Sequence, residues 1–169
     1  MTTICRFSEL NEPDQVEALN TIEKINKKTS TDPLGRTSWE NYTEIIKDRT
    51  KTCPNAKNTL FLARKINRFV GYAAFYTPAD NLWATNDLKT KEAYCSWIAV
   101  DPEHHCQGIA TDLQSKIFDS GEIISVKGHV KKTNEKTIGA IKKFNKKGYE
   151  VSIEESSKTQ YVYTISKKS

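Results

Sequence analysis

The sequence predicts a single α/β (α+β) domain of seven strands and four helices, and three observations support that prediction. Apolar stretches that suit strands are interleaved with segments whose apolar residues recur every three or four positions, as in amphipathic helices. The length of 169 residues suits one domain with one continuous core. Neither an internal repeat nor a low-complexity stretch marks a boundary, so one domain over residues 1–169 is expected.

The expected elements follow in the order β-α-α-β-β-β-α-β-α-β-β. Strands are expected at 3–8, 59–65, 69–76, 91–100, 123–130, 149–153 and 160–165, and helices at about 11–28, 108–120 and 134–147, with a further helix opening at 37–40.

Capping residues indicate where the helices begin and end. Asn11 or Glu12 can cap the first helix, and the proline that follows suits its first turn. The run Thr37-Ser38-Trp39-Glu40 is a capping box, and Gly121 and Gly148 end the two later helices. The positions expected to share one side of each helix are Val16, Leu19, Ile22 and Ile25; Trp39, Tyr42, Ile45, Ile46 and Arg49; Ile109, Leu113 and Ile117; and Ile138, Ile141 and Phe144.

Turn residues separate the strands. Cys53-Pro54-Asn55 breaks the chain, and Ile66-Asn67-Arg68 forms a tight turn between two strands. The polar stretch 77–90 is long enough for a connection to be functional or mobile. In the last strand, Tyr161, Tyr163 and Ile165 are expected on one face.

The composition points to a folded cytoplasmic protein without a membrane partner. Hydrophobic residues make up 37% of the chain, and no apolar run approaches the roughly 20 residues that span a bilayer. The first residues lack the apolar region of a secretory signal. The four cysteines form no Cys-x-x-Cys pair, which favours a reducing compartment. No metal is expected, because His104, His105 and Cys106 are adjacent and rarely converge on one ion.

The formal net charge of +5 arises from lysines that gather late in the chain. A solvated face is expected there, in place of a surface for nucleic acid. These lysines are Lys131, Lys132, Lys136, Lys142, Lys143, Lys146, Lys147, Lys167 and Lys168.

The most informative stretch runs from Ala99 to Thr111. Its pattern indicates a strand ending at Val100, a turn at Asp101-Pro102 and a helix starting near Gly108. Unpaired backbone N–H groups at a helix start attract an anion, and a glycine lets a phosphate approach the backbone closely. The alternative is an ordinary connection between a strand and a helix.

Three stretches in this order resemble the GNAT N-acetyltransferases. Residues 94–102 followed by 105–110 resemble the acetyl-CoA loop, in which Arg or Gln is followed by two residues, Gly, one residue, and Gly or Ala. Residues 140–149 resemble the family's late helix with its Lys-x-Gly-Phe ending, and Phe69-Val70-Gly71-Tyr72 resembles its third strand. The resemblance spans about residues 60–149. It implies the GNAT fold, with a mixed, mostly antiparallel seven-stranded sheet, and acetyl-CoA as the co-substrate.

The resemblance also implies a set of cofactor contacts. Backbone groups of the fourth strand would hold the pantetheine arm, the loop would hold the pyrophosphate, and a late lysine could reach the 3′-phosphate. The expected contacts are Ile98, Ala99, Val100, His105, Cys106, Gln107, Gly108, Ile109, Ala110, Thr111, Asn134, Phe144 and Lys146. Thr137 is the alternative to Asn134 in the alignment.

Two departures from the family pattern concern charge and proton transfer. His105 replaces the first motif residue, and a neutral imidazole contributes less to a diphosphate than a guanidinium. Phe144 stands where many members carry the Tyr that protonates the departing thiolate. Tyr149 or Tyr94 could supply that proton, and otherwise water does.

The base that deprotonates the amine is left open. Glu92 and Tyr94 are candidates, with Asp87 as a third, and each could equally be an ordinary residue at a strand end.

The function expected from the resemblance is acetyl transfer from acetyl-CoA to a primary amine of a small molecule or of a peptide or protein. A catalytically silent CoA-binding or basic interaction module is the alternative, and a monomer or homodimer is expected. Carboxylates and aromatic rings in the acceptor region suit a cationic amine, although an amphipathic helix packed on a sheet has the same pattern. These residues are Asp32, Trp39, Glu40, Tyr42, Glu44, Asp80 and Trp83.

Overall fold

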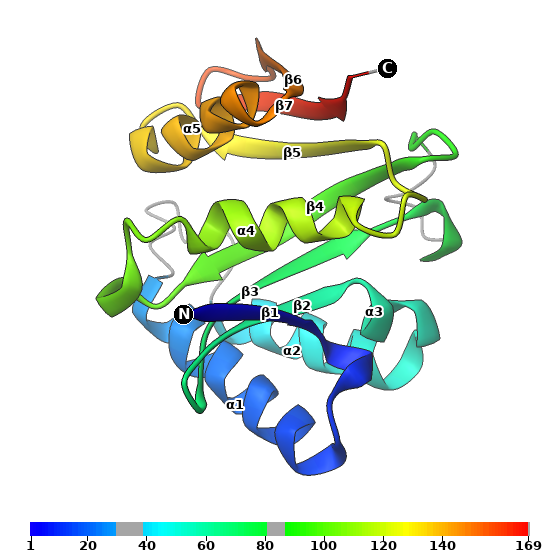
Figure 1. Cartoon of the computed structure of the whole chain (residues 1–169), viewed down its shortest axis with the longest axis vertical. Coiled ribbons are helices and arrows are strands. Elements are labelled where there is room, and N and C mark those ends of the chain that lie inside the picture. Colours follow the sequence, from blue (N-terminus) through cyan, green and yellow to red (C-terminus); the bar gives the residue numbers. More distant parts are fainter. Residues whose placement is uncertain (30–38, 81–86, 169) are drawn as a thin grey trace. The chain divides into compact units, whose positions relative to one another are not determined.

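The computed structural model describes residues 1–29, 39–80 and 87–168 (Figure 1). Its strands are β1 (Thr2–Arg6), β2 (Leu60–Lys65), β3 (Arg68–Tyr76), β4 (Glu92–Val100), β5 (Ser125–Lys131), β6 (Tyr149–Glu155) and β7 (Gln160–Lys167). Its α-helices are α1 (Glu12–Thr29), α2 (Trp39–Thr52), α3 (Pro54–Asn58), α4 (Ile109–Ser115) and α5 (Glu135–Lys142).

The strands form one seven-stranded sheet in the order β1-β2-β3-β4-β5-β7-β6. The pairs β1–β2, β2–β3, β5–β7 and β6–β7 are antiparallel, whereas β4 and β5 run parallel. The predicted mixed, mostly antiparallel sheet is confirmed.

The predicted number of four helices is wrong, because the described residues contain five. The extra helix is α3, where the sequence predicted only a break in the chain. Pro54 occupies the first helical turn and Cys53 is the N-cap. Proline suits that position, because its fixed φ matches the helix and its missing N–H would have had no partner there. A proline that follows one helix can therefore start the next.

The described residues form two compact units, which we describe separately. The first comprises residues 1–74 and 97–116, and the second comprises residues 75–96 and 117–169. The boundary passes through β3 and β4, so each of these strands contributes to both units. No helix in the described parts of the chain is both long and apolar enough to cross a membrane.

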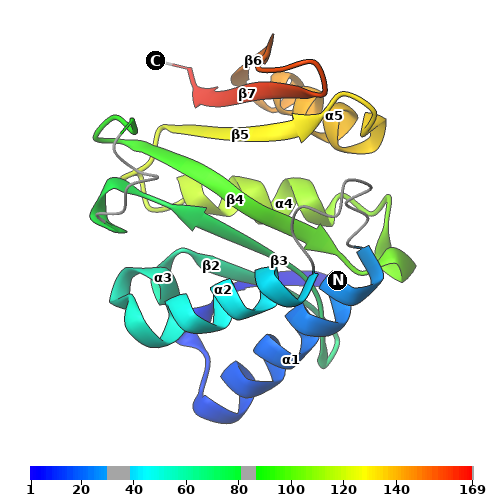
Figure 2. The same cartoon turned by 180° about the vertical axis from the view of Figure 1, so that it is seen from behind.

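In the first unit, α1 and α2 cover one face of β2 and β3 (Figure 2). Ile22, Ile25, Ile46, Leu62 and Tyr72 are buried in this core. Hydrogen bonds also cross it: the Tyr72 hydroxyl donates to Asn26 Oδ1, and Asn26 Nδ2 donates to Thr43 Oγ1 over 3.1 Å. Buried polar groups without such partners would destabilise the fold.

Two predicted core positions of the first unit are wrong. Val16 and Ile45 are 60% and 47% exposed. In α1 the buried row instead includes Ala18 and Asn26, which complete the helical spacing of Ile22 and Ile25. The periodicity was correct, but only large apolar residues were counted, so a small and a polar buried residue were missed.

Gly71 of β3 allows two elements of the first unit to approach closely. A Cβ at this position would lie 3.1 Å from the carbonyl oxygen of Ala99, and 3.3 Å from side-chain carbons of both Leu113 and Val100. The absence of a side chain therefore lets α4 and the end of β4 pack against β3. This packing fixes the start of the loop between β4 and α4.

In the second unit, α5 lies beside β5 and β7 (Figure 1). Its buried side chain Ile141 is joined in the core by Phe144, Val126, Ile165 and Tyr163. Of the predicted inward positions of this helix, Ile141 and Phe144 are buried and Ile138 is half-buried. On the predicted face of β7, Tyr163 and Ile165 are buried and Tyr161 is half-buried.

Several predicted boundaries shift in the structure. The first strand ends at Arg6, because Phe7–Glu9 form a 3₁₀ turn that buries Phe7. The two later helices end as 3₁₀ turns at Lys116–Phe118 and Lys143–Lys147. The capping box at 37–40 and the connection 77–90 lie partly outside the described residues.

Candidate functional site

The end of β4 is fixed by Asp101. Its backbone N–H donates to the carbonyl oxygen of Val70 over 2.8 Å, and its Oδ1 accepts the N–H of Glu103 over 3.1 Å. Its Oδ2 lies 3.3 Å from Nζ of Lys28 in α1. Burial alone would raise the pKa of Asp101, but the Glu103 N–H and Lys28 outweigh it and hold the pKa below its ordinary value.

His105 closes the loop that follows. Its Nε2 lies 2.9 Å from the carbonyl oxygen of Val100. A carbonyl oxygen can only accept, so Nε2 carries the proton and donates it. This side chain was predicted to approach a diphosphate, but in the structure it joins the two ends of the turn.

The next residues, Cys106 and Gly108, hold left-handed backbone conformations, with φ of 63° and 77°. Both residues and Gln107 between them are exposed. Left-handed residues next to ordinary ones turn successive N–H groups toward one side, which makes a concave anion site. A Cβ on Gly108 would meet nothing within 4 Å, so the loop leaves open space there.

Helix α4 begins directly after this turn. Its first backbone bond runs from the N–H of Asp112 to the carbonyl oxygen of Gly108 over 3.0 Å. The N–H groups of Ile109, Ala110 and Thr111 precede that bond and so lack an acceptor within the helix. The Thr111 side chain is buried, which sets it apart from the exposed turn.

Lys65 is a residue near this loop that sequence reasoning missed. Its Nζ lies 3.0 Å from Oε1 of Gln107, and both residues are part of the first unit. Lys65 ends β2 and is distant in sequence from the motif. The sequence indicates only that Lys65 lies at the end of a hairpin strand. It does not indicate which residues the lysine faces.

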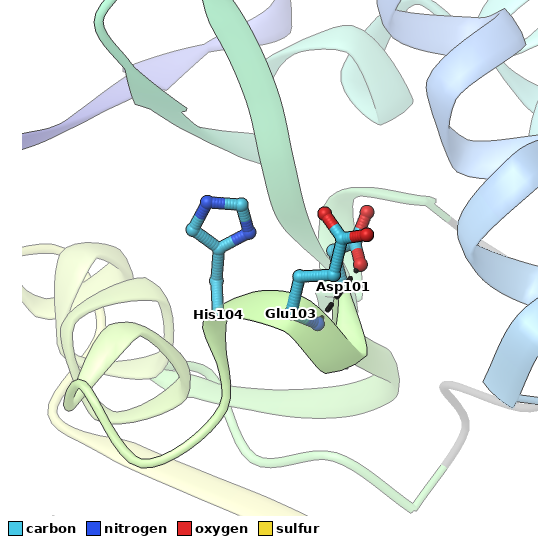
Figure 3. A group of neighbouring side chains, drawn as sticks. All are labelled: Asp101, Glu103 and His104. Atoms are coloured by element: carbon cyan, nitrogen blue, oxygen red, sulfur yellow. Dashed lines mark hydrogen bonds between the residues drawn. The ribbon is translucent and has the colours of Figure 1, made fainter.

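Asp101, Glu103 and His104 form the one group of potential metal ligands in the described ranges (Figure 3). Their ligand atoms lie within 4.8 Å of one another. Asp101, however, already binds Lys28 and the Glu103 N–H. The ammonium group supplies the positive charge that a metal would bring, so this group does not have the character of a metal centre.

In the second unit, Tyr94 and His129 form a hydrogen-bonded pair. The Tyr94 hydroxyl lies 2.6 Å from Nδ1 of His129, and the rings are inclined at 52°. Burial raises the pKa of Tyr94, and the neighbouring Cys95 and Tyr76 raise it further. The phenol therefore remains protonated at neutral pH. His129 did not appear among the candidates from sequence, because it lies on a different strand from Tyr94.

Glu92 lies on the same strand two residues before Tyr94. It is buried, and its Oε1 lies 3.2 Å from Nζ of Lys127 in β5. In the parallel register, Glu92 is opposite Ser125 and Tyr94 is opposite Lys127. Residues at alternate positions share a face, so Glu92, Tyr94, Lys127 and His129 lie on one face of the β4–β5 pair.

The remaining predicted residues of the second unit have structural contacts. Phe144 is fully buried, with its ring centre 5.5 Å from that of Tyr149. Tyr149 also packs on Phe118, with ring centres 5.0 Å apart. Asn134 is the N-cap of α5, where its Oδ1 accepts the N–H of Thr137 over 3.2 Å.

Of the acceptor candidates, Tyr42 contacts the ring of Trp97, which supports the packing interpretation for this residue. Asp80 accepts the N–H of Thr77 over 2.7 Å. Glu40 and Glu44 are exposed, and Asp32 and Trp83 lie outside the described residues.

Comparisons with known proteins agree with this architecture. The sequence model of a family described as the acetyltransferase (GNAT) family matches residues 19–145. No curated protein sequence matches the chain. Among solved structures, PH1933 from Pyrococcus horikoshii OT3 is similar with a TM-score of 0.68 and 18% identity, covering 100% of this chain and 99% of that one.

Two further similar structures carry names that state an acceptor. The diaminobutyrate acetyltransferase EctA from Paenibacillus lautus has a TM-score of 0.65 and 13% identity, covering 98% of this chain and 95% of that one. The ribosomal-protein-S18-alanine N-acetyltransferase from Escherichia coli has a TM-score of 0.61 and 15% identity, covering 100% of this chain and 96% of that one. At these identities the likeness shows the fold.

Proposed function

We propose, from the premise that this chain belongs to the acetyltransferase (GNAT) family, that it transfers the acetyl group of acetyl-CoA to a primary amine as a single domain. The observation that carries the proposal is the exposed turn between β4 and α4, where Cys106 and Gly108 are left-handed. Such a turn at a helix start suits a diphosphate, which is the most highly charged part of the linker in CoA.

The backbone of this turn would hold the pyrophosphate. The proposed donors are the N–H groups of Cys106, Gln107, Gly108, Ile109 and Ala110. Thr111 would contribute through its backbone, because its side chain is buried. Lys65, which bonds to Gln107, would add a positive charge beside the phosphates.

The backbone of β4 would hold the pantetheine arm. Ile98 and Ala99 are the proposed partners, with one N–H directed at the thioester carbonyl to stabilise the oxyanion. Val100 would contribute less, because its carbonyl oxygen already accepts the His105 ring. His105 would therefore act on the cofactor by shaping the loop.

Three residues of the second unit remain proposed cofactor contacts. Lys146 is exposed and could pair with the 3′-phosphate. Asn134 keeps its amide N–H₂ for the cofactor while its oxygen caps α5. Phe144 could offer only apolar surface, and it is fully buried.

Among the candidates near the proton transfers, the contacts favour Tyr94, through its hydrogen bond to His129, with water protonating the thiolate. Its hydroxyl is held by His129, and its raised pKa keeps the proton on the oxygen. Tyr149 packs between two phenylalanine rings, which is the environment of a core residue. Glu92 forms an ion pair with Lys127, so it is suited to fixing that lysine.

The acceptor is proposed only as an amine. A small diamine and a protein N-terminus appear in the names of the two similar structures, so both acceptor classes belong in the test. We expect an amine that reaches the site uncharged or loses its proton there, because only the free amine attacks a thioester.

The test is release of the CoA thiol from acetyl-CoA. Acceptors should include L-2,4-diaminobutyrate, spermidine, lysine and a peptide with an N-terminal alanine, each checked by the mass of the acetylated product. Thiol release together with an acetylated amine would support the proposal. Binding of acetyl-CoA without turnover would favour a silent CoA-binding module, and absence of binding would exclude the cofactor assignment.

A further inference from the structure

The pair formed by Tyr94 and His129 has properties that a packing role does not require. The phenol is half-buried, whereas the imidazole is exposed. Their hydrogen bond uses Nδ1 and so does not involve Nε2. A neighbour that fixes one ring nitrogen sets the tautomer and the direction of the other, which is how enzymes prepare a histidine for proton transfer.

We propose that His129 is the general base that removes a proton from the acceptor amine, and that Tyr94 is the positioning residue that holds its ring. This inference rests on the proposed acetyl transfer. It extends that function by assigning the base, for which the sequence suggested only Glu92, Tyr94 and Asp87.

The strand register explains why the two side chains meet. Tyr94 of β4 is opposite Lys127 of β5, and His129 lies two residues further along β5 on the same face. In a sheet, such diagonal neighbours lie within reach when the side chains are aromatic. The pairing is therefore built into the register of the parallel β4–β5 pair.

In the proposed step, a proton moves from the protonated acceptor amine to His129. One N–H bond of the protonated amine breaks, its electron pair stays on nitrogen, and the proton forms a new bond to Nε2 of His129. The Nδ1–H is shared with the Tyr94 oxygen throughout. The free amine then attacks the thioester carbon and the carbon–sulfur bond breaks. The nitrogen loses its second proton to water as the amide forms, and the departing thiolate takes a proton from water. His129 returns its proton to solvent, to which its ring is exposed.

The charges that face His129 come from three strands. From β4 there is Glu92, which is paired with Lys127 of β5, and Lys131 lies two residues beyond His129. Across β7, the register places Val162 beside His129 and Glu154 of β6 beside Val162. The direct contact of the imidazole is the phenol of Tyr94.

Steady-state kinetics with the best amine of the panel test this role. His129→Gln should lower kcat by about 10²- to 10³-fold near pH 7, within the range that general base catalysis contributes. The loss should shrink as the pH approaches the pKa of the amine, because free amine then forms without a base. Glu154→Gln, on the same exposed face, is the matched control and should retain the wild-type profile.

Tyr94→Phe should have a smaller effect, about 10-fold, because the base remains but its tautomer is no longer fixed. Nitrogen NMR of the His129 ring should report the change of tautomer in this variant. In His129→Ala, free imidazole in the buffer should restore part of the activity, which a structural role would not allow.

The outcomes separate this proposal from the proposed function. If wild-type protein turns over and His129→Gln is as fast as wild type across the pH range, the role of His129 is wrong and the acetyl transfer stands. If wild-type protein does not transfer acetyl groups to any amine, both proposals are wrong. A melting temperature and acetyl-CoA affinity equal to wild type must accompany the slow turnover of His129→Gln. If His129→Gln fails to fold or no longer binds acetyl-CoA, a role of His129 in proton transfer is contradicted.

Discussion

The imidazole of His105 donates from Nε2 to the carbonyl oxygen of Val100, over 2.9 Å, and so ties the motif loop to the last residue of β4. This contact shows what His105 does in place of the Arg or Gln of the family motif. A charged side chain at this position could contact a phosphate directly. The His105 ring instead stabilises the turn whose backbone N–H groups are proposed to do so.

His105→Ala should therefore weaken the loop before it weakens any direct ionic contact. We expect a loss of about 1 kcal/mol in the free energy of unfolding, the usual contribution of one hydrogen bond. Acetyl-CoA should bind several-fold more weakly, with the same dependence on salt as the wild type. Denaturant unfolding and titrations at two salt concentrations measure these effects. A much shallower salt dependence would instead indicate that His105 contacts phosphate as a cation.

The two glycines Gly108 and Gly121 allow a matched test of the turn. Both have positive φ, 77° and 76°, and neither has an atom within 4 Å of a built Cβ. Alanine at either position should therefore cost a similar amount, about 1–2 kcal/mol, from the left-handed backbone alone.

Only Gly108→Ala should impair the thermal stabilisation by acetyl-CoA, because only there would the new methyl group meet the phosphate. At one hundred times the dissociation constant, wild type and Gly121→Ala should gain about 2.7 kcal/mol. Equal stabilisation of both variants would place the pyrophosphate elsewhere.

The lowered pKa of Asp101 predicts that the free energy of unfolding depends on pH. Its pKa is lowered in the folded state, so the carboxylate stabilises the fold above its ordinary pKa, and this stabilisation is lost as the pH falls through the lowered value. Asp101→Asn should be less stable than wild type by about 1 kcal/mol at pH 7. The difference should shrink once the pH falls below the ordinary pKa of aspartate, about 3.9, and disappear as the pH passes through the lowered value. Urea unfolding from pH 7 to pH 2 measures it, and a constant difference would argue against the Lys28 pair.

The hydrogen bond between Tyr72 and Asn26 predicts that leaving a buried polar group unpaired lowers the free energy of unfolding. In Tyr72→Phe, the buried Asn26 oxygen would lose the hydroxyl that donates to it. Leaving a buried acceptor without its donor costs about 1–3 kcal/mol. Chemical denaturation gives the value directly. A variant as stable as wild type would mean that another donor reaches Asn26.

Much of the fold could be predicted from the sequence, because strand alternation, helical spacing and glycine stops are local signals. The turn at Ile66–Arg68, the end of β4 and the stop at Gly148 all follow from a few adjacent residues. Helix α3 could not be separated from a simple break, since Pro54 is compatible with both. Val16 and Ile45 show that an apolar residue in a correct helical period can still lie outside the buried row.

The candidate site was predictable only where it is contiguous in sequence. The loop from His105 to Ala110 has a recognisable pattern, whereas Lys65 and His129 reach their partners through strand pairing. A single sequence does not specify the register of two strands, so the Tyr94–His129 pair had no sequence signal. The Val100 contact of His105 likewise depends on a turn geometry that residue types alone do not determine.

Titration calorimetry with acetyl-CoA and with pantetheine tests the central claim most directly. Pantetheine has the arm but lacks the pyrophosphate, so the two ligands separate the contribution of the Cys106–Ala110 loop from that of β4. We predict one-to-one binding of acetyl-CoA and at least 100-fold weaker binding of pantetheine. Equal affinities for the two ligands, or no heat with millimolar acetyl-CoA, would contradict it.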